Sequence, residues 1–209
     1  HGVFAEESGA RPRDPNGPRW YVDPLDGTVN YAHGMPYFAV SLAFADAEGV
    51  QLGVVFDPIR EECFCAAQGQ GAWLNGRRLR VSQRTRLEDS LLITGFPYDM
   101  WTNPDNNVDN YGRFLRRTQG VLRLGAAALD LCHVAAGRAD GFWELRLKPW
   151  DVAAGGLIVR EAGGVITDLE GNPDYLASPQ PSVVAANPVL HPLMLAVLHG
   201  QDEPHVQPR

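Results

Sequence analysis

The chain has 209 residues, of which 44% are hydrophobic and 21% charged, and its formal net charge is −7. This composition is typical of a globular protein with enough apolar material for a sizeable core. The acidic balance argues against nucleic acid or an anionic membrane as the main partner, because both bind basic surfaces.

The predicted elements begin with a loop at residues 9–19, which is rich in Gly, Pro and Arg, and a short strand at residues 20–22. Residues 37–82 are predicted to form an antiparallel meander, in which Asn75-Gly76 is typical of a tight hairpin turn. Further strands are expected at 91–96, 140–145, 165–168 and 182–186, and helices at 104–118, 126–136, 152–162 and 191–199. This mixture favours an α+β or layered α/β fold.

The stretch WYVDPLDGTVNYAHG at residues 20–34 places two aspartates directly after a short apolar strand. Asp26 could simply cap a helical turn that starts at Gly27. Asp23 is harder to explain in this way, because Pro24 has no amide hydrogen that could solvate its carboxylate. A carboxylate at a buried strand end needs a cation or several hydrogen-bond donors. The pair therefore indicates a site for a divalent cation.

Three further acidic residues occur in comparable settings. Glu6 follows the apolar run VFA, Glu144 ends the predicted strand GFWEL, and Asp151 follows Pro149-Trp150, where it could act as the N-cap of a helix. Oxygen ligands without a nearby His or Cys suit Mg²⁺ or Mn²⁺ better than zinc. The Asp23–Asp26 spacing does not fit the D-x-D-G-T motif of haloacid-dehalogenase phosphatases, which has one residue between the aspartates, or the EF-hand loop.

Several motifs resemble those of the inositol monophosphatase family. DPLDGTVNYAHG resembles the signature D-P-[IL]-D-G-T-x-N-[FY]-x-x-G, and PWDVAAGGLIVREAGGVITD resembles the family's second signature. AEES at residues 5–8 is similar to a G-E-E-S element, and RLGAAALDLCHVAAGRADGFWELRLKPWD resembles bacterial members. The similarity runs from Glu6 to about Asn187, with the motifs in the family's order.

The resemblance implies a layered αβαβα sandwich of the sugar-phosphatase type, and we expect the N-terminal helical segment of that fold to be missing. We expect a single domain over residues 1–209. Residues 1–120 would form a metal-binding part with the antiparallel sheet, and residues 121–199 a C-terminal α/β part. Residues 200–209 are polar and are predicted to be a disordered tail.

The resemblance also implies roles for individual residues. Two or three Mg²⁺ ions would bind, with Mn²⁺ as a substitute, and Glu6, Asp23 and Thr28 would be catalytic. The metal ligands would be Glu6, Asp23, the Leu25 carbonyl, Asp26 and Asp151. The substrate contacts would be Asp26, Gly27, Thr28, Gly125, Ala126, Ala127, Glu144 and Asp151. Ala126 stands where the family often has Ser or Thr, so one hydrogen bond would be absent.

The predicted function is Mg²⁺-dependent hydrolysis of a phosphate monoester, myo-inositol-1-phosphate, by a metal-activated water. The resemblance implies inhibition by Li⁺ and a homodimer. Three cysteines without C-x-x-C spacing and the lack of a membrane-length apolar run favour a cytoplasmic protein. The alternatives are fructose-1,6-bisphosphatase or histidinol-phosphatase activity, or a non-catalytic metal- and phosphate-binding protein. Glu144 disfavours a bisphosphate, because it would repel a second phosphate.

Overall fold

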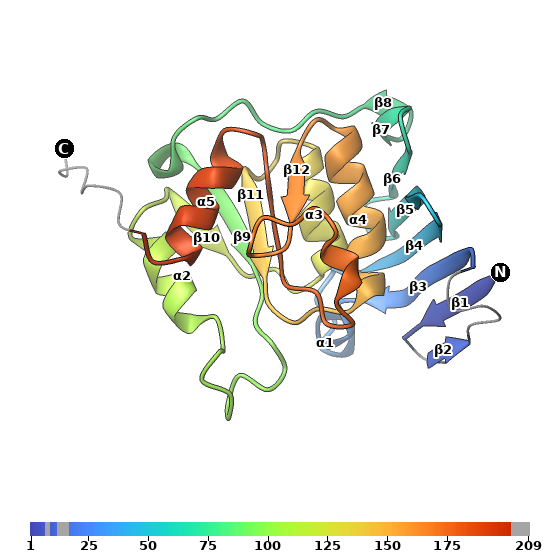
Figure 1. Ribbon diagram of the computed structural model, residues 1–209, viewed down its shortest axis with the longest axis horizontal. Coiled ribbons are helices and arrows are strands. Elements are labelled where there is room, and N and C mark those ends of the chain that lie inside the picture. Colours follow the sequence, from blue (N-terminus) through green and yellow to red (C-terminus); the bar gives the residue numbers. More distant parts are fainter. Residues whose placement is uncertain (7–8, 12–16, 202–209) are drawn as a thin grey trace.

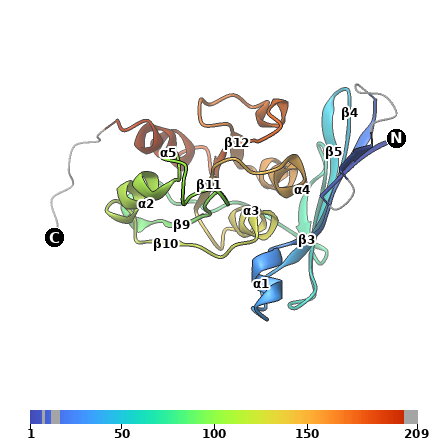
Figure 2. The same ribbon diagram turned by 90° about the horizontal axis from the view of Figure 1, so that it is seen from below.

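The computed structural model describes residues 1–6, 9–11 and 17–201, which form two β-sheets and the helices packed against them (Figure 1). The helices are α1 (Thr28–Ala32), α2 (Val108–Leu115), α3 (Ala127–Ala135), α4 (Pro149–Glu161) and α5 (Leu190–Leu198), with 3-10 turns at Leu87–Asp89 and Tyr175–Ala177. From below, the layers are the first sheet, α3 with α4, the second sheet, and α2 with α5 (Figure 2). The predicted layered α/β class is confirmed.

The first sheet has the order β2-β1-β3-β4-β5-β6-β7-β8. Its strands are β1 (Gly2–Ala5), β2 (Gly9–Arg11), β3 (Arg19–Asp26), β4 (Ala39–Asp46), β5 (Gly49–Asp57), β6 (Glu62–Ala67), β7 (Gly71–Leu74) and β8 (Arg77–Arg78). Strands β1 and β3 are parallel, and the other neighbours are antiparallel. The predicted meander is confirmed as β4–β8, and Asn75 and Gly76 both have positive φ, as its tight turn requires.

Two predictions about the start of this sheet are wrong. Residues 9–11, predicted as loop, form strand β2, while residues 12–16 of that predicted loop lie outside the described residues. Strand β3 continues to Asp26 although it was predicted to end at residue 22. Its pairing with β4 shifts in register between Asp23 and Asp26, and a proline can occupy such an irregular place because it leaves no ladder donor unpaired.

The second sheet has the order β10-β9-β11-β13-β12. Its strands are β9 (Leu91–Thr94), β10 (Gly120–Leu122), β11 (Gly141–Glu144), β12 (Val165–Thr167) and β13 (Val183–Ala186). The prediction missed β10, and α2 is shorter than the predicted helix over residues 104–118. Residues 202–209 of the predicted tail lie outside the described residues.

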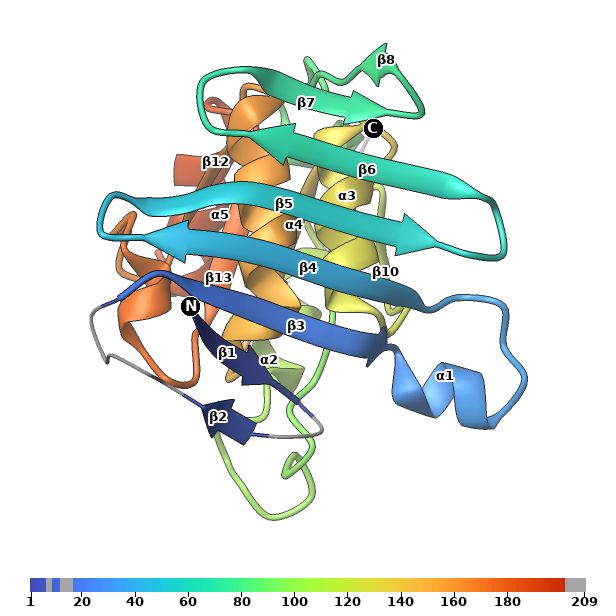
Figure 3. The ribbon, with the colours of Figure 1, turned by 90° about the vertical axis from the view of Figure 1, so that its right-hand side faces the viewer.

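Helix α4 lies between the two sheets, behind the first sheet in Figure 3, and residues 152–159 are buried all round. Small residues allow its close packing. A Cβ on Gly155 would lie 2.7 Å from the Leu131 Cβ of α3, and one on Gly53 of β5 would lie 2.9 Å from the Ala154 carbonyl oxygen. No helix of the described residues is long and apolar enough to cross a membrane.

Candidate functional site

The candidate site begins where β1 and β3 end side by side. Tyr21 and Asp23 face the buried side of β3, and Asp23 is only 2% exposed. Because β1 runs parallel to β3 with Ala5 opposite Val22, Glu6 follows directly beside Asp23. The other residues of the AEES element, Glu7 and Ser8, lie outside the described residues. The parallel pairing therefore brings together two of the predicted acids.

The turn after Asp23 is held by its own polar groups. The Leu25 amide donates to Asp23 Oδ1 at 2.9 Å, and the Thr28 hydroxyl donates to the Leu25 carbonyl at 3.0 Å. Gly27 has φ 92°, a left-handed conformation that glycine adopts without strain, and α1 starts immediately after it. The predicted helical turn after Asp26 is confirmed, with Gly27 and not Asp26 as its N-cap.

Asp151 adds a carboxylate to the site from a distant part of the sequence, the first turn of α4. The hypothesis that it is an N-cap is wrong by three positions, because α4 begins at Pro149 and Lys148 is the N-cap. Asp151 accepts a hydrogen bond of 2.8 Å from the Lys148 amide through Oδ2, as the third residue of a capping box does. This bond orients the carboxylate, and Asp151 interacts with Asp23 across the site.

Burial and mutual repulsion raise the pKa values of these acids. Burial, with smaller contributions from Asp151 and Glu6, raises the pKa of Asp23 from 3.8 to about 8. Burial and then Glu6 raise the pKa of Asp151 to about 6. The pKa of Asp26 lies well above its ordinary value, through burial and then the charges of Asp23 and Asp151. The site thus concentrates negative charge where water screens it poorly.

The donor set fits a hard divalent cation in its chemistry, since it consists of carboxylate and carbonyl oxygens that repel one another without a counter-charge. In the ranges that the structure describes, no group of three or more His, Cys, Asp or Glu side chains is arranged to hold a metal ion as it stands. Backbone amides occupy one oxygen each of Asp23 and Asp151. Each of these hydrogen bonds uses one lone pair of the carboxylate and leaves others for a cation.

The second sheet supplies Glu144 at the end of β11, as predicted. Its carboxylate lies against the Gly95 backbone, where a Cβ would be only 2.1 Å from Glu144 Oε1. Burial and then the charges of Asp130 and Asp151 raise the pKa of Glu144 well above its ordinary value. The repulsion from Asp151 shows that acids of the two parts of the fold lie near one another.

Gly125, Ala126 and Ala127 lead into α3 beside the Asp26 turn. The Ala128 amide in the first turn of this helix donates to Asp26 Oδ2 at 2.8 Å. The side chains of Ala126 and Ala127 are buried, at 1% and 6% exposure. Any contact of these two residues with a ligand would therefore involve their backbone.

Sequence reasoning missed one further acid near this cluster, Asp130. Asp130 is 1% exposed and accepts a 2.7 Å hydrogen bond from the Tyr37 hydroxyl, and burial raises its pKa to about 8. An acid among the apolar residues of ALDLCHVA was the available signal.

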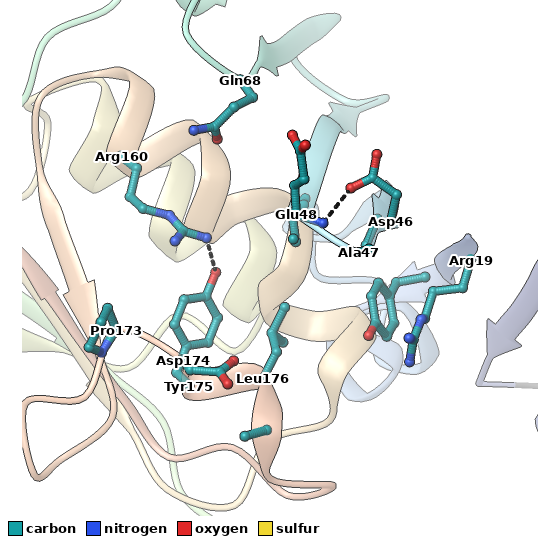
Figure 4. A pocket seen from close by; sticks show the side chains of 15 residues that line it. Arg19, Asp46, Ala47, Glu48, Gln68, Arg160, Pro173, Asp174, Tyr175 and Leu176 are labelled. Atoms are coloured by element: carbon teal, nitrogen blue, oxygen red, sulfur yellow. Dashed lines mark hydrogen bonds between the residues drawn. The ribbon is translucent and has the colours of Figure 1, made fainter. Parts of the chain in front are cut away.

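A cavity of about 470 Å³ lies elsewhere, near the start of β3 and the end of α4 (Figure 4). Arg19 and Arg160 line it together with three acids, Asp46, Glu48 and Asp174, so its lining has no excess of positive charge for a phosphate. None of the predicted site residues is part of this lining. The acid cluster, and not this cavity, is the candidate site.

The two-sheet fold with acids at its strand and helix ends defines a layered α/β protein of the sugar-phosphatase type. The model of the inositol monophosphatase family matches residues 1–203. The chain therefore belongs to the inositol monophosphatase family.

Individual relatives agree with this assignment. The chain is similar to Nus factor SuhB of Pseudomonas aeruginosa, with 45% identity over 214 residues, covering 100% of this chain and 76% of that protein. It is similar to the structure of inositol monophosphatase from Anabaena (Nostoc) sp. PCC 7120, with a TM-score of 0.92 and 44% identity, covering 96% of this chain and 79% of that chain. A structure of inositol monophosphate-bound SaIMPase-II has a TM-score of 0.82 and 27% identity, covering 96% and 80% of the two chains.

Proposed function

We propose that this chain is a Mg²⁺-dependent phosphomonoesterase that hydrolyses inositol monophosphate to inositol and phosphate. The observation that carries the proposal is the meeting of Glu6, Asp23 and Asp26 with Asp151, which comes from the start of α4. Membership of the inositol monophosphatase family supports it, and so does the relative that was solved with inositol monophosphate bound.

The acids would divide the binding of magnesium between them. Glu6, Asp23 and the Leu25 carbonyl would hold one ion, and Asp23, Asp26 and Asp151 a second. When bound, Mg²⁺ lowers the pKa of a water ligand and offsets the charge of the phosphate oxygens. The raised pKa values of Asp23 and Asp151 support this division, because buried acids without a counter-charge retain protons that a cation would displace.

Thr28 and Glu6 would orient the attacking water. The Thr28 hydroxyl donates its proton to the Leu25 carbonyl, so its oxygen lone pairs remain available to accept a hydrogen bond from water. Glu6 follows β1 beside Asp23 and could accept a second hydrogen bond from the same water. The amides of Gly27 and Thr28, at the start of α1, would bind phosphate oxygens.

Glu144 would recognise the polyol by accepting hydrogen bonds from its hydroxyl groups. A carboxylate in this position would repel a second phosphate, which disfavours fructose-1,6-bisphosphate. A histidinol phosphate has an ammonium group that Glu144 could also bind, so this substrate stays the alternative within the class.

A second candidate function is non-catalytic binding of metal and phosphate, within a protein assembly. The observation that favours it is the name Nus factor SuhB carried by a relative at 45% identity. The exposed aromatic side chains of Tyr98 and Trp101, at 89% and 91% exposure, offer a contact surface for a partner.

The test is phosphate release from inositol-1-phosphate, fructose-1,6-bisphosphate and histidinol phosphate with Mg²⁺, with chelator, and with Mg²⁺ plus Li⁺. The proposal expects turnover of inositol-1-phosphate that is lost with chelator and reduced by Li⁺. A folded protein that binds Mg²⁺ and inorganic phosphate but turns over none of the three would favour the binding function instead. Sedimentation of the same sample would test the homodimer.

A further inference from the structure

The Asn30 side chain connects two parts of the candidate site that are distant in sequence. Its Nδ2 donates to the carbonyl oxygens of Tyr37 at 2.9 Å and Leu124 at 2.8 Å, with a longer contact to the Gly125 carbonyl at 3.3 Å. Asn30 belongs to α1, directly after the Gly27-Thr28 turn, and is 9% exposed. One amide group therefore ties this turn to the segment that precedes α3.

The Gly27-Thr28 turn and the segment that precedes α3 are also tightly packed against each other. A Cβ on Gly27 would lie 3.0 Å from the Tyr37 carbonyl oxygen, 3.2 Å from the Ala126 Cβ and 3.3 Å from the Gly125 carbonyl oxygen. A Cβ on Gly125 would in turn lie 3.2 Å from Asn30 Nδ2. Both glycines have positive φ, so neither conformation suits another residue. The turn and the segment are in direct contact, and Asn30 is the hydrogen-bond donor that joins them.

We propose that Asn30 is a positioning residue that sets the distance between the phosphate side of the site, Gly27-Thr28, and the predicted substrate-contact segment Gly125–Ala127. It would thereby determine selectivity for a polyol phosphate over a simple phosphate ester. The inference rests on the proposed function for the identity of the two sides. The contacts that carry it are independent of that function.

The physical reason lies in the three carbonyl oxygens that converge on one amide. Without Nδ2 they would lose their shared donor and repel one another, and a buried unpaired carbonyl is costly. The Gly125 segment would then move away from the turn. Asp23 and Asp26 would keep their orientation, because their hydrogen bonds come from the Leu25 and Ala128 amides. The loss should therefore fall on substrate recognition more than on phosphate chemistry.

The test compares inositol-1-phosphate with p-nitrophenyl phosphate, which has no polyol hydroxyls, in the Asn30→Ala variant with saturating Mg²⁺. We expect the ratio of the two kcat/KM values to fall roughly tenfold or more, mainly through KM for the polyol substrate. Asn30→Asp should be worse than Asn30→Ala, since it places a carboxylate against three carbonyl oxygens. An equal loss for both substrates would overturn the inference and leave a purely structural role.

Asn187→Ala is the matched control. Asn187 is also buried, at 4% exposure, and its Nδ2 also joins two backbone carbonyls, those of Ser82 at 3.0 Å and Arg84 at 2.8 Å, away from the acids. It should lower thermal stability while the substrate ratio stays at the wild-type value. A ratio that changes as much in Asn187→Ala as in Asn30→Ala would also overturn the inference.

A second measurement separates this inference from the proposed function. If the wild-type chain hydrolyses neither ester, the proposed function fails, and hydrogen exchange of the folded protein decides about Asn30. Asn30→Ala should then speed amide exchange in residues 124–127 at least about tenfold, with Ala128, β5 and β6 unchanged. Unchanged exchange in residues 124–127 would overturn the positioning role.

Discussion

The Asp26 carboxylate accepts a 2.8 Å hydrogen bond from the amide of Ala128, although 102 positions separate the two residues. Asp26 ends β3 of the first sheet, and Ala128 lies in the first turn of α3. Backbone amides in the first turn of a helix have no partner within the helix, so a carboxylate there is stabilised. The candidate site is therefore complete only when α3 has docked on the first sheet.

Replacing Asp151 by asparagine should abolish turnover without unfolding the chain. Asparagine keeps an oxygen for the Lys148 amide, which preserves the start of α4, but removes the charge that would hold a cation. We expect kcat to fall by roughly 10³-fold or more, which corresponds to about 4 kcal/mol of transition-state stabilisation. Asp109→Asn, an exposed acid in the first turn of α2, is the matched control. Near-normal turnover of Asp151→Asn would contradict the metal assignment.

Magnesium should stabilise the protein more at high pH than at low pH. The pKa values of Asp23 and Asp151 are raised from 3.8 to about 8 and about 6, so between these limits the folded state holds protons that the unfolded state has lost. Their contribution to stability is lost as pH rises through these values, and a cation would replace it. The increase in Tm caused by Mg²⁺ over EDTA should be small near about pH 5 and grow towards about pH 8. Equal increases at both pH values would speak against a cation at these acids.

Asp130 should make the stability of the wild type fall with pH. Burial raises its pKa from 3.8 to about 8, so the folded state keeps a proton that the unfolded state loses. Between these values the unfolding free energy should decrease by at most about 1.4 kcal/mol per pH unit for this group. Asp130→Asn, which can still accept the Tyr37 hydrogen bond, should remove that component. Urea titrations at several pH values, without Mg²⁺, would measure the difference in slope.

Tyr37→Phe should strengthen the pH dependence that Asp130→Asn removes. The Tyr37 hydroxyl hydrogen bond lowers the pKa of Asp130, so its removal should raise that pKa further. The decrease in stability should then extend to higher pH than in the wild type. Identical slopes in wild type, Asp130→Asn and Tyr37→Phe would rule out Asp130 as the source.

Gly95→Ala should displace Glu144. The new Cβ would lie 2.1 Å from Glu144 Oε1, a distance that forces the carboxylate away from the backbone. We expect KM for inositol-1-phosphate to rise roughly tenfold while p-nitrophenyl phosphate is affected less. Gly112→Ala in α2 is the control, since its Cβ would meet only Arg116 Nη1 at 3.8 Å. This control should stabilise the protein by about 0.5–1 kcal/mol, and activity should not change. Equal KM values for Gly95→Ala and wild type would contradict the role of Glu144.

Local patterns in the sequence predicted the elements that depend on local chemistry. The Asn75-Gly76 turn and the β4–β8 meander follow from backbone preferences and alternating burial, which act over a few residues. The limits of β3 could not be predicted in this way. A proline such as Pro24 normally ends a strand. Strand β3 continues to Asp26 only because it pairs with β4 across an irregular register.

Within the candidate site, too, local motifs predicted some residues, and others depend on contacts between distant segments. The DPLDGT motif identified Asp23 and Asp26 as unusual acids, and family motifs pointed to Glu6, Glu144 and Asp151. The importance of Asn30 and Asp130 was not readable, because their partners, the carbonyls of Leu124 and Gly125 and the hydroxyl of Tyr37, are distant in sequence.

The sequence by itself determined which residue types are present and which local turns they form: carboxylates after a strand, a glycine with positive φ, and a proline at the start of α4. Only the tertiary structure decided which of these groups meet. The pKa values of Asp23, Asp26 and Asp151 rise because separate segments bury the acids together and exclude water. Desolvation and repulsion depend on distance in space, which the order of residues along the chain does not specify.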